Sequence, residues 1–242
     1  IDLAKATDRG IVVMNTPGGN TVSAAEHTFG LMVALARHIP QAHASLSAGH
    51  WDRKTFTGVE LHGKTLGVVG FGRIGQAVAQ RALAFGMTVL ANDPYIMSDL
   101  SYGTGVELLS LDAMLARADF VTLHSIVSDE TREMINAETI AKMKDGARLI
   151  NVARGQLINE ADLAQALDSG KLAGAALDVY QQEPPPENHP LIGHPKVVHT
   201  PHLGASTSDA QVAVAVEAAE LLITALRKEE YSNVVNPDVL TV

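Results

Sequence analysis

The chain contains no cysteine, few aromatic residues and no long hydrophobic run. Without cysteine it forms no disulfide, binds no metal through thiolates and has no cysteine nucleophile, a composition that suits a cytoplasmic protein. No apolar stretch approaches the roughly 20 residues of a membrane-spanning helix, and no signal peptide is evident, so no membrane partner is expected. The formal net charge of -9 argues against a nucleic-acid partner.

The length of 242 residues, 46% of them hydrophobic and 19% charged, allows one large α/β domain or one domain with part of another. The opening residues IDLAKATDRG contain no initiator Met and predict a helix that Gly10 ends. We therefore expect an N-terminal portion to precede them in the natural protein.

A glycine-rich turn between a predicted strand and a predicted helix is the strongest signal in the sequence. The apolar, β-branched run 65–69 predicts a strand covered on both faces. Gly70, Gly72 and Gly75 follow in the pattern G-x-G-x-x-G, and a helix over 73–85 opens on them. The first glycine permits a tight turn, the second lets backbone approach a pyrophosphate, and the third lets helix pack on strand. The helix N-terminus then faces the phosphates.

Asp93 lies at the end of the next predicted strand, 87–91, about twenty residues past the glycines. A carboxylate at this place accepts hydrogen bonds from the 2′-hydroxyl of a ribose. It would repel the 2′-phosphate of NADP, and the neighbouring Pro94 and Tyr95 supply no positive charge. The sequence therefore predicts NAD as the cofactor, and the alternative is an ordinary βαβ crossover.

Strands and helices alternate through the rest of the chain. We expect strands at 119–123, 147–152, 173–179 and 197–200, and helices at 111–116, 137–143 and 160–167. This alternation predicts an α/β fold with a doubly wound parallel sheet, a Rossmann-like NAD-binding domain whose ligands lie beyond the carboxyl ends of the strands. A long C-terminal helix over 206–230 carries a stripe that we predict to face a core: Val212, Val216, Ala219, Ile223 and Leu226.

Residues 11–63 precede the first nucleotide-binding strand. We expect a strand at 11–14, a helix from Asn20 or Thr21 to Ile39, an interruption at Pro40 and a second helix over 41–48. The first helix is more apolar than an exposed arm requires. A subunit interface explains this, and so does packing against the sheet of the same chain.

Polar residues just past the predicted strands are the candidates for chemistry: His124, Arg154, Asp178, Glu183 and His202. The guanidinium of Arg154 can hold a substrate carboxylate through two hydrogen bonds and polarise a neighbouring carbonyl, although a surface salt bridge is an equal alternative. His202 can exchange the proton that an alcohol oxygen loses when hydride leaves its carbon.

Two acids can assist these groups. Glu183 lies in the loop QQEPPP and can hydrogen-bond His202, fixing its tautomer, if the loop folds over the crevice. Asp178 can accept a hydrogen bond from the nicotinamide carboxamide, and a buried structural Asp is an equal alternative.

Other histidines compete with His202. We place His27, His38 and His43 in helix bodies and His189 and His194 in a surface loop, where solvated side chains are usual, and His199 is the main rival. A zinc site from His194, His199 and His202 fits no usual ligand spacing, so no metal is expected.

Several segments together carry a family resemblance: NTPGGNTVSAAEHTFGLMVALAR, LHGKTLGVVGFGRIG, NVARGQLINEADLAQAL, AGAALDVYQQEPP and TPHLGAST. They cover nearly the whole chain, and it resembles the D-isomer-specific 2-hydroxyacid dehydrogenases. The resemblance implies a triad of Arg154 for the substrate, Glu183 as the partner and His202 as the acid/base. We expect NAD contacts from these residues: Gly70, Gly72, Arg73, Ile74, Gly75, Asp93, His124, Ser125, Val152, Ala153, Arg154, Asp178, His202 and Gly204.

The resemblance also implies a reaction. We expect hydride transfer between NAD and a D-2-hydroxy acid, in the first place 3-phosphoglycerate, giving the 2-oxo acid 3-phosphohydroxypyruvate in serine biosynthesis. The alternatives are a glyoxylate/hydroxypyruvate reductase and an NAD-sensing, corepressor-like binding protein.

A domain division follows from the resemblance too. We expect a remnant of the substrate domain and hinge at 1–15, an NAD-binding domain at 16–204 with a homodimer arm at about 20–63, and a C-terminal helix and tail at 205–242 that returns toward the substrate domain. Most of that domain would precede the first residue, so we expect this chain to bind NAD and turn over poorly.

Overall fold

A computed structural model describes residues 1–96 and 105–241. The chain divides into two compact units: residues 24–204 form the larger one, and residues 1–23 with those from 205 onward form the smaller one. The functional division expected from the sequence, into 1–15, 16–204 and 205–242, stays a prediction.

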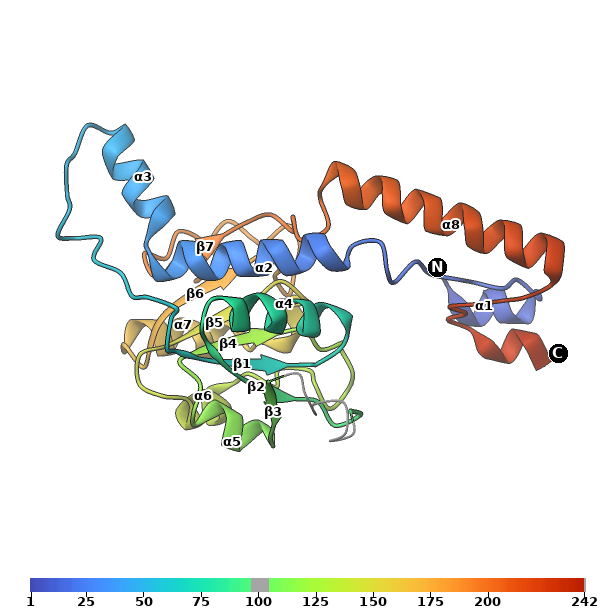
Figure 1. Ribbon diagram of the computed structural model, residues 1–242, viewed down its shortest axis with the longest axis horizontal. Coiled ribbons are helices and arrows are strands. Elements are labelled where there is room, and N and C mark those ends of the chain that lie inside the picture. The colour runs from blue at the N-terminus through green and yellow to red at the C-terminus, as the bar shows by residue number, and fades with distance from the viewer. Residues whose placement is uncertain (97–104, 242) are drawn as a thin grey trace. The chain divides into compact units, whose positions relative to one another are not determined.

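Within the described residues, the larger unit is built on a seven-stranded parallel sheet with the order β3-β2-β1-β4-β5-β6-β7 (Figure 1). The strands are β1 (Thr65–Val69), β2 (Thr88–Asn92), β3 (Val106–Leu108), β4 (Phe120–Leu123), β5 (Ala147–Asn151), β6 (Leu172–Leu177) and β7 (Val197–His199). The chain winds in opposite directions on either side of β1 and β4, which confirms the doubly wound, Rossmann-like fold.

Two helices supply the core on one face of the sheet. They are α2 (Thr21–Ala36), from Ala24 onward in this unit, and α4 (Arg73–Ala84). Met32 of α2 and Val78 of α4 are fully buried in one cluster with Val68 of β1. The apolar character of α2 is thus accounted for by the sheet of its own chain.

Three helices supply the core on the other face: α5 (Leu111–Leu115), α6 (Ala137–Lys142) and α7 (Glu160–Asp168). Their apolar side chains form a second buried cluster with the strand residues that point to this face, as Ile140 does with Val121. Because successive strand residues point to opposite faces, short apolar strands can fill both layers at once.

The carboxyl ends of five neighbouring strands lie level in the sheet. The register pairs Val69 with Leu123, Leu123 with Asn151, Asn151 with Leu177, and Leu177 with His199. The residues that follow these five therefore leave the sheet along one edge. This is the edge at which open α/β sheets bind their ligands.

The smaller unit contains α1 (Leu3–Asp8), α8 (Ser208–Lys228) and the 3-10 helix η3 (Pro237–Thr241). The strand expected at 11–14 is wrong, since Met14 makes only an isolated antiparallel bridge with Val234 in the described chain. The reason is that the amide of Val13 donates to the side chain of Asn236 instead of to a partner strand.

The apolar stripe predicted on the C-terminal helix is present, but it does not face a core. The side chains of Val212 and Leu226 are 64% and 83% exposed. The contacts of α8 are made by its opposite face, where Ala210 and Ala225 are buried and Glu217 accepts a hydrogen bond from a backbone amide. Helical periodicity identifies an apolar stripe, but it does not say which face finds a partner.

The break after α2 also differs from the prediction. Helix α2 ends at Ala36, and α3 (Ile39–Ser47) contains Pro40 in its first turn, where proline is tolerated. The chain turns at His38, whose φ of 53° is left-handed, so His38 lies between helices and not in a helix body. Strand β3 was not expected, because three residues are too few to show a period.

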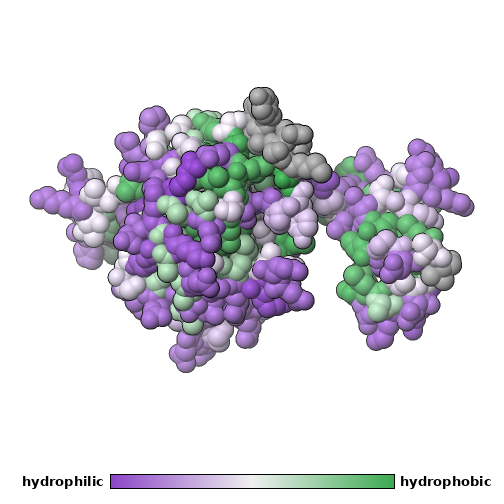
Figure 2. Space-filling view, turned by 90° about the horizontal axis from the view of Figure 1, so that it is seen from below, coloured by the Kyte–Doolittle hydropathy of each residue, from purple (hydrophilic) through white to green (hydrophobic). Residues whose placement is uncertain are grey.

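Hydrophobic side chains also reach the surface. Figure 2 shows hydrophobic residues in green among hydrophilic residues in purple on the face that it draws. Exposed large side chains include Ile39 and Leu46 on α3 and Trp51 after it. Among the described residues, no helix combines the length and the apolar character needed to cross a bilayer.

Candidate active site

The glycine loop after β1 is shaped by steric necessity at two of its three glycines. Gly70 has a φ of 87°, and a Cβ there would lie 2.7 Å from backbone atoms of His124 and Ser125. A Cβ on Gly75 would overlap the carbonyl oxygen of Gly70. These two glycines are therefore needed for the close approach of β1, β4 and α4.

Gly72 differs from its neighbours because a Cβ there would meet open space. It is the N-cap of α4 and no side chain caps that helix, so the first amide groups are available to an anion. An open backbone loop before an uncapped helix fits the pyrophosphate of NAD, and Arg73 and Ile74 lie in the first helical turn beside it. The residues of this loop that were predicted to contact the cofactor thus lie next to one another at the start of α4.

Asp93 follows β2 at the same edge. Its Oδ2 accepts a hydrogen bond from the amide of Phe71 at 2.8 Å, and its Oδ1 accepts one from the amide of Tyr95 at 2.9 Å. These bonds fix the carboxylate next to the glycine loop. A carboxylate accepts about four hydrogen bonds, so both oxygens keep capacity for the hydroxyls of a ribose.

His124 and Ser125 follow β4 beside Gly70. A ring nitrogen of His124, Nε2, lies 3.0 Å from the hydroxyl of the buried Thr122. Burial lowers the pKa of His124 to about 4, so the ring is neutral at pH 7. A neutral imidazole suits a hydrogen-bonding neighbour of the cofactor better than a proton-exchanging group.

Glu183 and His202 are joined by a short hydrogen bond between the loops that follow β6 and β7. Oε2 of Glu183 lies 2.7 Å from Nδ1 of His202, and Oε1 accepts from the amide of Tyr180 at 3.1 Å. Because an ionised carboxylate only accepts, Nδ1 carries the hydrogen and Nε2 is the nitrogen left to exchange a proton. The side chains are 38% and 49% exposed, so a ligand can reach them.

Asp178 is fully buried and anchors the loop that carries His202. The backbone amides of His202, Leu203 and Gly204 donate to its carbonyl oxygen, Oδ1 and Oδ2 at 2.8, 2.7 and 2.8 Å. These bonds hold His202 at a φ of 55°, a strained conformation that persists only where the surroundings enforce it. Asp178 therefore has the structural role that was the alternative to cofactor binding. Its contact with nicotinamide stays a prediction.

Arg154 follows β5 with Val152 and Ala153, and its side chain is exposed. The buried Asn151 holds this turn: its Oδ1 accepts from the amide of Ala153 at 3.0 Å and its Nδ2 donates to the carbonyl of Arg154 at 2.9 Å. The guanidinium itself donates to the carbonyl of Ala153 at 2.6 Å. The structure thus places Arg154 at the common edge, without a direct contact to the Glu183–His202 pair among the described interactions.

Gly155 brings the Arg154 turn against the loop that carries Glu183. A Cβ on Gly155 would overlap the carbonyl group of Tyr180 and crowd the amide of Gln181. The two segments can therefore lie together only because residue 155 has no side chain. Gly204 is similarly enclosed, since its Cβ would lie 2.8 Å from Val152 and 3.3 Å from Asp178.

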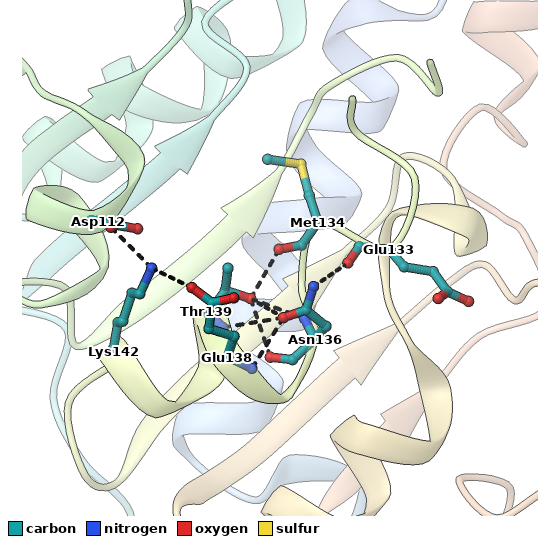
Figure 3. A network of polar contacts seen from close by, with 7 residues as sticks. All are labelled: Asp112, Glu133, Met134, Asn136, Glu138, Thr139 and Lys142. Atoms are coloured by element: carbon teal, nitrogen blue, oxygen red, sulfur yellow. Dashed lines mark hydrogen bonds and ion pairs between the residues drawn. The ribbon is translucent and has the colours of Figure 1, made fainter. Parts of the chain in front are cut away.

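A polar network surrounds the start of α6 (Figure 3). Asn136 caps α6, accepting from the amides of Glu138 and Thr139, and its Nδ2 donates to the carbonyl of Glu133 at 2.9 Å. The carboxylate of Glu133 in turn accepts from Nε2 of Gln181 at 3.0 Å. The capping network of α6 thus reaches a residue two positions before Glu183.

The rival histidines have partners of their own. The expectation of solvated side chains at His189 and His194 is wrong: they are 7% and 11% exposed and lie beside the carboxylates of Glu160 and Asp168. Nδ1 of His199 lies 2.7 Å from the hydroxyl of Tyr180. Burial, and then the nearby His194 and His189, lower the pKa of His199. Burial, and then Glu160 and Asp178, raise the pKa of Tyr180 to about 12. Both groups are thus held in their neutral forms at pH 7, in a cavity that Glu183 also lines.

Three residues of this site were not singled out by the sequence. Asn151 and Gly155 lie close to Arg154 in the segment NVARG. Nothing in the sequence except this closeness to a candidate residue points to them. His27 was placed with the solvated histidines, and this is wrong. Its Nε2 lies 3.2 Å from Oδ1 of Asp178, because the face of α2 that carries it is turned to the sheet.

Comparison with known proteins identifies relatives. The family model described as D-isomer specific 2-hydroxyacid dehydrogenase, NAD binding domain, matches residues 29–204. A D-3-phosphoglycerate dehydrogenase of Bacillus subtilis is 51% identical over 220 residues, which cover 91% of this chain and 42% of the relative. The chain thus spans less than half the length of that relative.

Solved structures resemble the chain as a whole. A glyoxylate reductase from Paecilomyes thermophila matches with a TM-score of 0.89 and 36% identity, covering 97% of this chain and 71% of the other. D-Lactate dehydrogenase from Aquifex aeolicus, complexed with NAD and lactic acid, matches with a TM-score of 0.88 and 31% identity, covering 98% and 76%. The match to an NAD binding domain confirms the predicted cofactor.

Proposed function

Because the chain belongs to the D-isomer specific 2-hydroxyacid dehydrogenases, we propose that its site interconverts a D-2-hydroxy acid and the corresponding 2-oxo acid with NAD. One observation carries this proposal: the 2.7 Å hydrogen bond between Glu183 and His202. It provides an oriented proton acceptor at the ligand edge of an NAD-binding sheet, which oxidation of an alcohol requires.

The residues of the site divide the work between binding and proton transfer. NAD, when bound, supplies the redox chemistry by taking up a hydride from the substrate carbon or returning it. Nε2 of His202 takes the proton of the 2-hydroxyl during oxidation and returns it to the carbonyl oxygen during reduction. Glu183 keeps the ring in one orientation and stabilises its positive charge while it holds the proton. Arg154 binds the substrate carboxylate through two hydrogen bonds.

The proposed substrate is 3-phosphoglycerate, which would be oxidised to 3-phosphohydroxypyruvate in serine biosynthesis. What supports this choice is identity: 51% to a D-3-phosphoglycerate dehydrogenase, against 36% to a glyoxylate reductase. The glyoxylate reductase structure favours the second candidate, reduction of glyoxylate or hydroxypyruvate.

We further propose that the segment of about 20–63 forms a homodimer arm. Helix α2 finds partners in its own sheet, so it does not support this idea. The support comes from the following segment, where none of the nine residues of α3 is buried and Trp51 is 76% exposed.

NADH oxidation by phosphohydroxypyruvate, hydroxypyruvate and glyoxylate tests the proposed reaction, in the wild type and in His202→Gln. We expect the highest kcat/KM with phosphohydroxypyruvate, and a loss in His202→Gln of about 100-fold or more, as is typical for a general acid/base. His43→Gln is the matched control, since His43 is exposed on α3.

Other outcomes have definite meanings. A preference for glyoxylate would replace the proposed substrate by that of the second candidate. Equal background rates in the wild type and His202→Gln, with NADH bound by both, would overturn the proposal in favour of an NAD-sensing binding protein.

A further inference from the structure

A histidine on α2 reaches the ligand edge of the sheet from outside the proposed catalytic set. Nε2 of His27 lies 3.2 Å from Oδ1 of Asp178 and 3.0 Å from the hydroxyl oxygen of Thr200. Asp178 and Thr200 are the first residues after β6 and β7. The side chain of His27 is 23% exposed and that of Asp178 is fully buried.

The partners of His27 determine where its hydrogen is. Thr200 donates its hydroxyl hydrogen to Oδ1 of Asp178 at 2.5 Å. A hydroxyl has one hydrogen, so toward His27 it can only accept, and an ionised carboxylate also only accepts. Nε2 of His27 must therefore carry a hydrogen, which it shares between the two oxygens.

Asp178 transmits this contact to His202. Three successive amides, those of residues 202, 203 and 204, donate to Asp178, so the position of this one residue sets the path of the loop. A buried carboxylate that loses a donor shifts or takes up another partner. Any shift of Asp178 would move the ring of His202 relative to Glu183.

We propose that His27 is a positioning residue of this site: by donating to Asp178 and Thr200 it fixes the carboxylate that holds the His202 loop. The effect on turnover rests on the proposed function of His202. The effect on the geometry of the His202 ring follows from the hydrogen bonds alone. Helix α2 thereby becomes part of the machinery that orients the proton-exchanging group.

The test compares His27→Leu, which removes the donor, with His27→Gln, whose amide can still donate. Nitrogen-15 NMR of the histidine rings, with the His202 signals assigned by their loss in His202→Gln, reports the tautomer of His202. We expect one tautomer with hydrogen on Nδ1 in the wild type and His27→Gln, and a mixture in His27→Leu. We also expect kcat to fall about tenfold in His27→Leu, the equivalent of about 1.4 kcal/mol, with KM within twofold. His43→Leu is the control for the loss of a histidine, and its oligomeric state is compared with that of the wild type because α3 belongs to the proposed homodimer arm.

The outcomes separate this inference from the proposed reaction. Equal turnover in the wild type and His202→Gln would overturn the reaction, while the change in the His202 signals in His27→Leu would still support the role of His27. Unchanged signals and unchanged kcat in His27→Leu would overturn that role. If His27→Leu does not fold, His27→Phe keeps a ring at this position without a hydrogen-bond donor. It is then expected to give the same mixture of tautomers, and a wild-type spectrum would count against the proposal.

Discussion

Gly72→Ala separates binding of the cofactor from stability of the fold. A Cβ at this position meets open space, and the φ of Gly72 is -72°, which alanine adopts without strain. Alanine restricts the unfolded chain, which stabilises by about 0.4–1 kcal/mol, while alanine as an N-cap costs a similar amount. The free energy of unfolding should therefore stay within about 0.5 kcal/mol of the wild type.

The same methyl group should weaken binding of NAD. We expect the pyrophosphate to approach the backbone at Gly72, and forcing an extra carbon into a packed contact costs about 1–3 kcal/mol. This corresponds to an affinity lower by about 5- to 150-fold. Titration of NADH by fluorescence or calorimetry measures the affinity, and urea unfolding measures the stability.

Gly75→Ala is the matched control, because its Cβ would overlap the carbonyl oxygen of Gly70 and lie 3.2 Å from Val68. We expect a loss of about 3 kcal/mol in the free energy of unfolding, the upper end of overpacking costs, since the obstacle is backbone. Wild-type NADH affinity in Gly72→Ala would refute the placement of the pyrophosphate. A loss of more than about 1 kcal/mol in the free energy of unfolding of Gly72→Ala would refute the conclusion that a Cβ at Gly72 meets open space.

Two further predictions follow from the same edge of the sheet. Gly155→Ala should lose about 3 kcal/mol in urea unfolding, because a Cβ there overlaps the carbonyl of Tyr180, and a loss below about 0.5 kcal/mol would contradict the contact. His124 has its pKa lowered from 6.5 to about 4, so between these values the unfolded state binds a proton that the folded state does not. The wild type should therefore lose about 2 kcal/mol between pH 7 and pH 5 from this residue. Urea unfolding at both pH values should show that loss reduced in His124→Gln, and equal losses in the two proteins would refute the assignment.

Much of this fold was predictable because its signals are local. A short, mostly apolar strand, three glycines at fixed spacing and an acid after the next strand can be recognised without knowing any distant contact. The rule that ligands bind beyond the carboxyl ends of parallel strands then selected five candidates from among many polar residues. The family resemblance singled out Arg154, Glu183 and His202 among them. The hydrogen bond between Glu183 and His202 depended on one further assumption, that the loop folds back, and the structure contains that bond.

Other features could not be predicted, since they depend on which surfaces meet. The stripe on α8 is apolar whether or not it is covered, and Val212 is 64% exposed. His27 has the same local surroundings as a solvated helix residue, and only the packing of α2 on the sheet turns it toward Asp178.

The sequence by itself determined most of the strands and helices, the glycine loop and the residue types at the strand ends, because periodicity and turn chemistry act over a few residues. Only the tertiary structure decided that Gly155 must admit the Tyr180 backbone and that Asp178 gathers three amides and His27. Such contacts join segments far apart in the chain. Their strength comes from burial and mutual orientation, which no short stretch of sequence contains.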